Sequence, residues 1–175
     1  KIKLLFSSLT KCFDWEKVYE NQQLIGLKKN GSSITLEPGG QIELSGAPVK
    51  NLFQTCQQVN THKNELKDVS KLLNIDYMGM GVLPKWNLKE IPIMPKKRYE
   101  IMRDYMKKVG THGLDMMFRT CTIQANLDFD SEADMVKKMR VALAIQPAII
   151  ALYANSPFVE GKLTKFCSYR SMIWT

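Results

Sequence analysis

The chain has 175 residues, a formal net charge of +8 and four cysteines. This length fits one ordinary domain with a core of its own. The cysteines lie far apart without a Cys-x-x-Cys pair, which disfavours a zinc site. No apolar run approaches the length of about 18 residues that marks a membrane-spanning helix, so we expect no membrane partner.

The excess of basic residues favours an anionic partner without naming one. Residues 85–110 contain eight Lys or Arg against three Asp or Glu, and they carry most of the excess. Nucleic-acid binders usually interleave basic residues with stacking aromatics or show a known module, and neither is found here. We therefore expect no nucleic-acid partner. The phosphates of a nucleotide, or the carboxylates of amino acids, fit such a short basic cluster equally well.

In chain order, the first predicted elements are a short helix over residues 15–23 and a strand over residues 24–28. Asn30-Gly31 is a hairpin signal, so residues 33–37 should return beside that strand. Residues 41–45 form the next predicted strand. Three strands this close together in sequence predict an antiparallel sheet.

The middle of the chain predicts helices separated by a loop. From Val49 to Leu73, apolar residues recur at intervals of three and four, which predicts one long helix with its apolar stripe in the core. His62, on or beside this stripe, is expected to be packed or half-exposed. Residues 75–82 are predicted as a strand, and prolines then mark an irregular loop. A helix should cover residues 97–109, with a core-facing side made of Tyr99, Met102, Tyr105, Met106 and Val109.

Residues 114–129 predict a strand with one polar and one apolar side. The polar side consists of Thr120, Thr122, Gln124, Asn126 and Asp128. Arg119 falls on the apolar side, where a structural salt bridge is its expected use. Ser131 begins a capping sequence for a helix over residues 135–154, which Pro147 should kink or divide.

Two acidic residues flank a predicted chain reversal at Pro38-Gly39-Gly40. An unbroken strand would hold Glu37 and Glu43 about 20 Å apart, at roughly 3.3 Å per residue. Proline presets one dihedral and glycine tolerates positive φ, so the chain can fold back and bring both carboxylates to one place. Two hard oxygen ligands suit Mg²⁺. The alternative is a surface hairpin with two solvated acids.

A series of motifs bears on that choice. In order, they are Glu37-Pro38-Gly39-Gly40-Gln41, Pro84-Lys85-Trp86, Ile91-Pro92-Ile93-Met94-Pro95-Lys96, Gly113-Leu114-Asp115-Met116-Met117, Ala154-Asn155-Ser156-Pro157-Phe158 and Arg170-Ser171-Met172-Ile173-Trp174-Thr175. Over residues 33–175 this series resembles the glutamate-cysteine ligase family of plants and many bacteria. The Gly-Gln-x-Glu segment also resembles, more faintly, the metal strand of glutamine synthetases, to whose superfamily these ligases belong.

The resemblance implies an α+β fold, in which a glutamine synthetase-like curved antiparallel sheet has helices packed on one face. Residues 1–175 would be a single partial catalytic domain, truncated at both ends and inactive alone. The implied reaction is the ATP- and Mg²⁺-dependent ligation of L-glutamate, through γ-glutamyl phosphate, to the amine of L-cysteine, the first step of glutathione biosynthesis. The implied partners are glutamate, cysteine and ATP, for a monomer or homodimer in a bacterial cytoplasm or a plant plastid.

The resemblance also implies a metal site and a redox site. Glu37, Glu43 and Gln124 would bind the metal, with Gln124 at a strand position where relatives carry a metal-binding histidine. A structural amide is the alternative for Gln124. Cys56 sits where plant enzymes of the family carry a redox-switch cysteine, against the alternative of a buried helix cysteine.

The substrate residues follow from the same resemblance. Arg98 and Arg170 would clamp substrate carboxylates, for which the planar fork of arginine is well suited. The alternatives are an exposed arginine at a helix start for Arg98 and a structural ion pair for Arg170. Asn126 would line the substrate and Phe129 would form the floor of the cysteine pocket, unless Phe129 is a core aromatic. The reaction needs no nucleophilic side chain, so none is assigned.

Two other functions remain open on the sequence. One is a related carboxylate-amine ligase with another amine acceptor. The other is a non-catalytic basic module that binds a polyanion, for which we would expect steeply salt-dependent binding that Glu37→Gln leaves unchanged.

Overall fold

The computed structural model describes all residues, 1–175, in two compact units. The first contains residues 1–78 and 92–108, and the second contains residues 79–91 and 109–175. The interpretation as one partial domain stays a prediction. No helix combines the length and the apolar character that crossing a bilayer would require.

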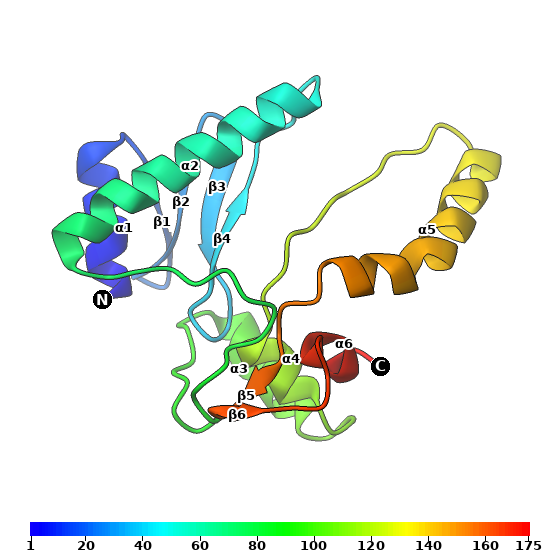
Figure 1. Ribbon diagram of the computed structural model, residues 1–175. Helices are drawn as coiled ribbons and strands as arrows, with labels where there is room; N and C mark the ends of the chain where they lie inside the picture. The colour runs from blue at the N-terminus through cyan, green and yellow to red at the C-terminus, as the bar shows by residue number, and fades with distance from the viewer. The chain divides into compact units, whose positions relative to one another are not determined.

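The first unit is built on a four-stranded antiparallel sheet (Figure 1). Its strands are hydrogen-bonded in chain order: β1 (Glu16–Glu20), β2 (Gln23–Lys29), β3 (Ser32–Leu36) and β4 (Ile42–Ser45). The predicted sheet and the Asn30-Gly31 hairpin are therefore confirmed. The helix predicted over residues 15–23 is wrong, because Asn21 and Gln22 both adopt positive φ and form a two-residue turn that pairs β1 with β2.

Two of the three helices of this unit precede and follow the sheet in the chain. α1 (Ile2–Cys12) contacts β1, β2 and α2 (Leu52–Leu73), and apolar side chains from α1 and the strands form the core. The fully buried members include Leu5, Phe6, Leu9, Leu27, Ile34, Leu36 and Val69. α2 begins at Asn51, whose side chain accepts a hydrogen bond from the backbone N–H of Gln54, and ends at Asn74 in the left-handed region.

The long helix predicted from Val49 to Leu73 is confirmed as α2, but its predicted core stripe is wrong over the N-terminal half. Leu52 and Phe53 are 74% and 86% exposed, and only Val69 of that stripe is fully buried. The charged residue Glu65 is buried on this helix, where it accepts hydrogen bonds from Trp15 and Lys29. Periodicity shows which residues share a helix face, whereas these contacts decide which face turns toward the sheet.

α3 (Lys97–Met106) completes the first unit within the range predicted for it. Tyr99 is fully buried as expected, whereas the predicted core positions Tyr105 and Val109 are exposed. The second unit contains α4 (Gly113–Arg119), α5 (Glu132–Leu152), a short hairpin of β5 (Phe158–Val159) and β6 (Lys162–Leu163), and α6 (Tyr169–Ile173). Ser131 caps α5 by accepting a hydrogen bond from the N–H of Asp134. The helix contains Pro147 and is bent in Figure 1, as predicted.

Two predicted strands are wrong. Within residues 75–82 only Val82 pairs, in a single bridge to Thr120. The first part of residues 114–129 is helix α4, because it contains good helix formers and no β-branched residue before Thr120. The backbone N–H of Cys121 donates to the carbonyl of Gly81 at 3.0 Å beside this bridge, but residues 122–129, which carry the alternating pattern, belong to no strand.

The salt bridge predicted for Arg119 is confirmed. Its side chain is only 3% exposed, and its Nη2 lies 2.6 Å from Oε1 of Glu160. Its Nε lies 3.3 Å from Oδ1 of Asp115, one helical turn earlier on α4. The guanidinium therefore joins α4 to the turn between β5 and β6.

Candidate functional site

The β3–β4 hairpin places two carboxylates on one face of the sheet. Thr35 lies opposite Glu43 in the register, and the backbone N–H of Glu37 donates to the carbonyl of Gln41 at 2.9 Å. Residues directly opposite each other share a face, and faces alternate along a strand. Glu37 and Glu43 therefore lie on the same face, near the turn where Gly40 adopts a φ of +90°.

The start of α3 is anchored to the end of this hairpin. The pairing of β2 with β3 stops at Gly26 and Thr35, so the carbonyl of Leu36 lies beyond that ladder. Lys96 Nζ donates to this carbonyl at 2.8 Å, and the Tyr99 hydroxyl donates to it at 2.6 Å. These buried donors satisfy a backbone acceptor that the sheet leaves unpaired.

Charged groups of both signs gather around this anchor. We name Glu20, Glu37, Glu43, Lys96, Arg98 and Tyr99 the hairpin cluster. Burial lowers the pKa of Lys96, while the charges of Glu37, Glu20 and Glu43 oppose that shift and Arg98 adds to it. Burial and the charge of Glu37 raise the pKa of Tyr99 to about 12. The cluster therefore contains three carboxylates and two cations within electrostatic reach of one another.

Arg98 and Glu20 complete the hairpin cluster from two other elements. The exposed guanidinium of Arg98, on the first turn of α3, lies 5.0 Å from the centre of the Tyr99 ring. A carboxylate oxygen of Glu20, at the end of β1, accepts a hydrogen bond from the backbone N–H of Lys97 at 3.0 Å. Sequence analysis missed Glu20 and Lys96; the only available signal was the place of Lys96 in the motif ending Met94-Pro95-Lys96.

The sequence model of the family described as Glutamate-cysteine ligase family 2 matches residues 13–175. The chain belongs to this family. It is 58% identical over 175 residues to a glutamate-cysteine ligase, chloroplastic, from Nicotiana tabacum, covering 100% of this chain and 34% of that relative. It is 59% identical over 171 residues to the one from Solanum lycopersicum, covering 98% of this chain and 33% of that relative. The chain thus spans about a third of the length of these curated relatives.

The site residues expected for a glutamate-cysteine ligase are divided between the two units. Glu37, Glu43 and Arg98 come together in the hairpin cluster of the first unit. The other four, Gln124, Asn126, Phe129 and Arg170, belong to the second unit. The first three of these are exposed on the segment without regular structure, so their assignment as ligands stays a prediction.

Arg170 and Cys56 have definite surroundings within their own units. Arg170 Nε donates to the carbonyl of Cys121 at 3.1 Å, its guanidinium lies 5.2 Å from the centre of the Trp174 ring, and burial lowers its pKa. This arrangement differs from the ion pair weighed as its structural alternative. Cys56 is a free, exposed thiol, so the alternative of a buried helix cysteine is wrong. Its redox role stays a prediction.

The donor chemistry of the hairpin fits the magnesium that the ligase family implies. No group of three or more His, Cys, Asp or Glu side chains in the chain is arranged to hold a metal ion. Mg²⁺ needs no such group, because it usually binds one or two protein carboxylates and keeps water and phosphate in its other positions. Glu37 and Glu43 supply two such carboxylates on one sheet face.

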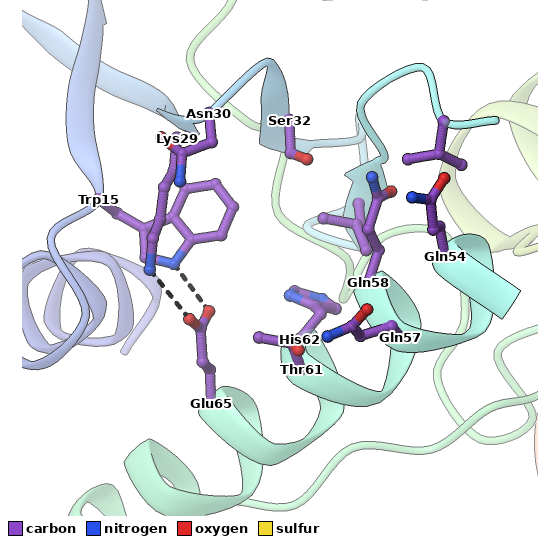
Figure 2. Close-up of a pocket in the computed structure, with 12 residues that line it drawn as sticks. Trp15, Lys29, Asn30, Ser32, Gln54, Gln57, Gln58, Thr61, His62 and Glu65 are labelled. Atoms are coloured by element: carbon purple, nitrogen blue, oxygen red, sulfur yellow. Dashed lines mark hydrogen bonds and ion pairs between the residues drawn. The ribbon is translucent and has the colours of Figure 1, made fainter.

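A separate cavity of about 360 Å³ lies between α2 and the other face of the sheet (Figure 2). Leu44 lines it, whereas the neighbouring Glu43 belongs to the opposite face. Within it, Glu65 accepts hydrogen bonds from Trp15 Nε1 at 2.8 Å and from Lys29 Nζ at 3.3 Å. The cavity therefore lies on the opposite face of the sheet from Glu37 and Glu43, and no residue of the hairpin cluster lines it.

His62 beside this cavity predicts a pH-dependent stability. Its Nδ1 is buried without a hydrogen-bond partner, and burial lowers its pKa below the ordinary 6.5, with Glu65 opposing. Below about pH 6.5, His62 binds a proton in the unfolded chain, whereas in the folded chain it binds this proton only at a lower pH. We therefore expect the free energy of unfolding to fall as the pH drops through about 6.5, a loss that His62→Gln should reduce.

Urea unfolding at about pH 7.5 and about pH 5.5 measures this difference, because these values bracket the ordinary histidine pKa. The matched control is His112→Gln, at the chain's other histidine, which should retain the acid loss of the wild type. Equal acid losses in the wild type and in His62→Gln would contradict the role of His62.

Proposed function

We propose that this chain supplies part of the active site of a ligase that joins L-glutamate to the amine of L-cysteine while converting ATP to ADP and phosphate. The single observation that carries the proposal is the pair of carboxylates, Glu37 and Glu43, on one face of the β3–β4 hairpin beside Arg98, in a chain of this family. The names of the curated relatives support the choice of substrates. In this proposal β1–β4 belong to a glutamine synthetase-like curved sheet.

Each residue of the hairpin has a proposed task. Glu37 and Glu43 hold Mg²⁺, which when bound offsets the charge of the ATP phosphates. Arg98 is exposed and forms no ion pair, so its planar fork is suited to a carboxylate of glutamate. Lys96 is buried and already bound to Leu36 and Tyr99, which makes it a supporting group and not a substrate ligand.

The proposed reaction has two steps and uses no protein nucleophile. A γ-carboxylate oxygen of glutamate attacks the γ-phosphorus of ATP and releases ADP, giving γ-glutamyl phosphate. The cysteine amine then attacks the acyl carbon, so a C–N bond forms, the C–O bond to phosphate breaks, and phosphate and a proton leave. The protein contributes by holding the reactants in line and excluding competing geometries.

The second unit has proposed tasks as well. Gln124 assists the metal site, Arg170 binds a substrate carboxylate, and Asn126 and Phe129 contact the amino acids. Cys56, an exposed thiol on α2, is a redox-sensitive position. The relatives are named as chloroplastic, and we place a plant protein of this sequence in the plastid as a monomer or homodimer.

The test uses the full-length protein with glutamate, cysteine, ATP and Mg²⁺. We expect ADP and γ-glutamylcysteine to form in equal amounts, with no ADP when glutamate is omitted. Faster product formation with another amine than with cysteine would replace the proposed acceptor. Absence of ADP formation with every amine would overturn the ligase proposal.

Replacing Arg98 by Ala should chiefly weaken glutamate binding. A lost charge-assisted, bidentate contact to a carboxylate should raise the KM for glutamate by about 10- to 100-fold. The KM for ATP should change little, because Arg98 is assigned to the amino acid. Steady-state kinetics with each substrate varied in turn measures the KM for glutamate and the KM for ATP separately.

Arg103→Ala is the matched control for Arg98→Ala. Arg103 lies on the same helix, and its Nε contacts only the exposed Asp104 at 3.4 Å. This variant should keep the wild-type KM for glutamate. An unchanged KM in Arg98→Ala, or an equal rise in both variants, would remove Arg98 from the site.

A further inference from the structure

The Tyr99 hydroxyl occupies a fully buried position at the end of β3. It donates a hydrogen bond to the carbonyl oxygen of Leu36 at 2.6 Å, and it accepts a hydrogen bond from Lys96 Nζ at 3.2 Å. A phenol has a single proton to donate. The proton of Tyr99 is therefore committed to the carbonyl of Leu36, the residue directly before Glu37.

These contacts connect segments that are far apart in sequence. Leu36 and Glu37 are adjacent at the hairpin, whereas Lys96 and Tyr99 come from the start of α3, about 60 residues later. The same helix start presents Arg98. The Tyr99 hydroxyl therefore fixes the backbone directly before Glu37.

Lys96 adds a buried positive charge to the same place. Its side chain is 8% exposed, and it is attracted by Glu37, Glu20 and Glu43. It forms no direct salt bridge with any of these carboxylates, because its hydrogen bonds go to Leu36 and Tyr99, so its charge acts on them over a longer distance. A divalent cation that approaches Glu37 and Glu43 meets the repulsion of this ammonium.

We propose that Tyr99 is a positioning residue that holds the backbone directly before Glu37, and through it places the Glu37 carboxylate for a divalent cation, and that Lys96 is the internal counter-charge that limits the affinity for that cation. This inference rests on the proposed function, because it takes Glu37 and Glu43 as the metal ligands. It makes two predictions of opposite sign. Removing the Tyr99 hydroxyl should weaken cation binding, whereas removing the Lys96 charge should strengthen it.

The experiment measures Mn²⁺ binding to the full-length protein by the loss of the electron paramagnetic resonance signal of the free ion. Mn²⁺ is the probe because it shares the oxygen-ligand preference of Mg²⁺. Tyr99→Phe should raise the Kd for Mn²⁺ by about tenfold, as expected for the loss of one hydrogen bond that fixes the backbone before a metal ligand. Tyr105→Phe, at an exposed tyrosine of the same helix, should keep the wild-type Kd.

Lys96→Met should lower the Kd for Mn²⁺ by about threefold or more, because one repelling charge is removed while Tyr99 still holds Leu36. The exposed Lys97→Met is its control and should leave the Kd unchanged. Loss of structure alone would weaken binding in both test variants, so the opposite signs separate positioning from folding. If Tyr99→Phe does not fold, the direction of the change in Kd for Mn²⁺ in Lys96→Met decides whether the inference holds.

Activity gives a second readout. Tyr99→Phe should need more Mg²⁺ for half-maximal rate but reach nearly the wild-type kcat when Mg²⁺ is saturating, since the ligand remains and only its orientation is lost. Wild-type Kd values in Tyr99→Phe or weaker binding in Lys96→Met would overturn the inference. If Glu37→Gln binds Mn²⁺ as tightly as the wild type, the metal site of the proposed function fails instead.

Discussion

Glu43→Gln should lower the ligase turnover of the full-length protein by at least about a thousandfold, because it removes the charge of one proposed Mg²⁺ ligand that stabilises phosphoryl transfer. The fold should persist. The Glu43 side chain is exposed on β4, and the hydrogen bond that it accepts from Ser45 Oγ is long at 3.4 Å. ADP release under saturating substrates measures the turnover, and circular dichroism with thermal melting measures the fold.

Glu16→Gln provides the matched control for this loss. Glu16 is an exposed glutamate on β1 of the same sheet and forms a solvent-exposed ion pair with Lys28. Surface pairs of this kind contribute little, so the control should keep wild-type turnover. Turnover within a few-fold of the wild type in Glu43→Gln, with an intact fold, would show that Glu43 is no metal ligand.

Glu65→Ala should lower the free energy of unfolding by about 3 kcal/mol, the scale for breaking a buried charged interaction from one side. Glu65 is 6% exposed, and its two oxygens accept hydrogen bonds from Trp15 and Lys29 (Figure 2). Removing it leaves the indole N–H buried without a partner and deprives Lys29 of its counter-ion. Urea unfolding followed by tryptophan fluorescence measures the change.

Asp68→Ala tests whether the effect belongs to the buried site or to helix α2 in general. Asp68 lies one turn later on α2, and its side chain is 62% exposed with only a long contact to Lys71. We expect a change within about 0.5 kcal/mol for such a surface position. Equal losses in Glu65→Ala and Asp68→Ala would show that the contacts of Glu65 with Trp15 and Lys29 do not stabilise the fold.

Predictions based on local turn and capping chemistry were confirmed. Asn30-Gly31 predicts a tight hairpin because those residues tolerate positive φ, and Ser131 predicts a helix start because its hydroxyl accepts a backbone N–H. Both rules involve neighbours within a few residues. Local information failed at residues 15–23, where the turn formed by Asn21 and Gln22 makes β1 a strand only by pairing it with β2.

Predictions based on the spacing of apolar residues were less reliable. Such a spacing shows which residues share one face of a strand or helix, but it does not show what that face packs against. Residues 122–129 alternate correctly for a strand, yet no neighbouring strand hydrogen-bonds to them, and Leu114 to Arg119 preceding them are helical. In α2 the apolar period is genuine, but Phe53 faces solvent while Glu65 is buried. The salt bridge of Arg119 was predicted correctly, although the prediction placed Arg119 on the apolar side of a strand and the residue lies on helix α4.

The order of residues along the chain was sufficient to establish the family and to place Glu37 and Glu43 around one reversal, because both depend on motifs and on turn geometry within a few residues. The hairpin cluster required the folded structure. Tyr99 and Lys96 reach the carbonyl of Leu36 across about 60 residues, and no local rule predicts which buried donor will satisfy an acceptor at the end of a distant ladder.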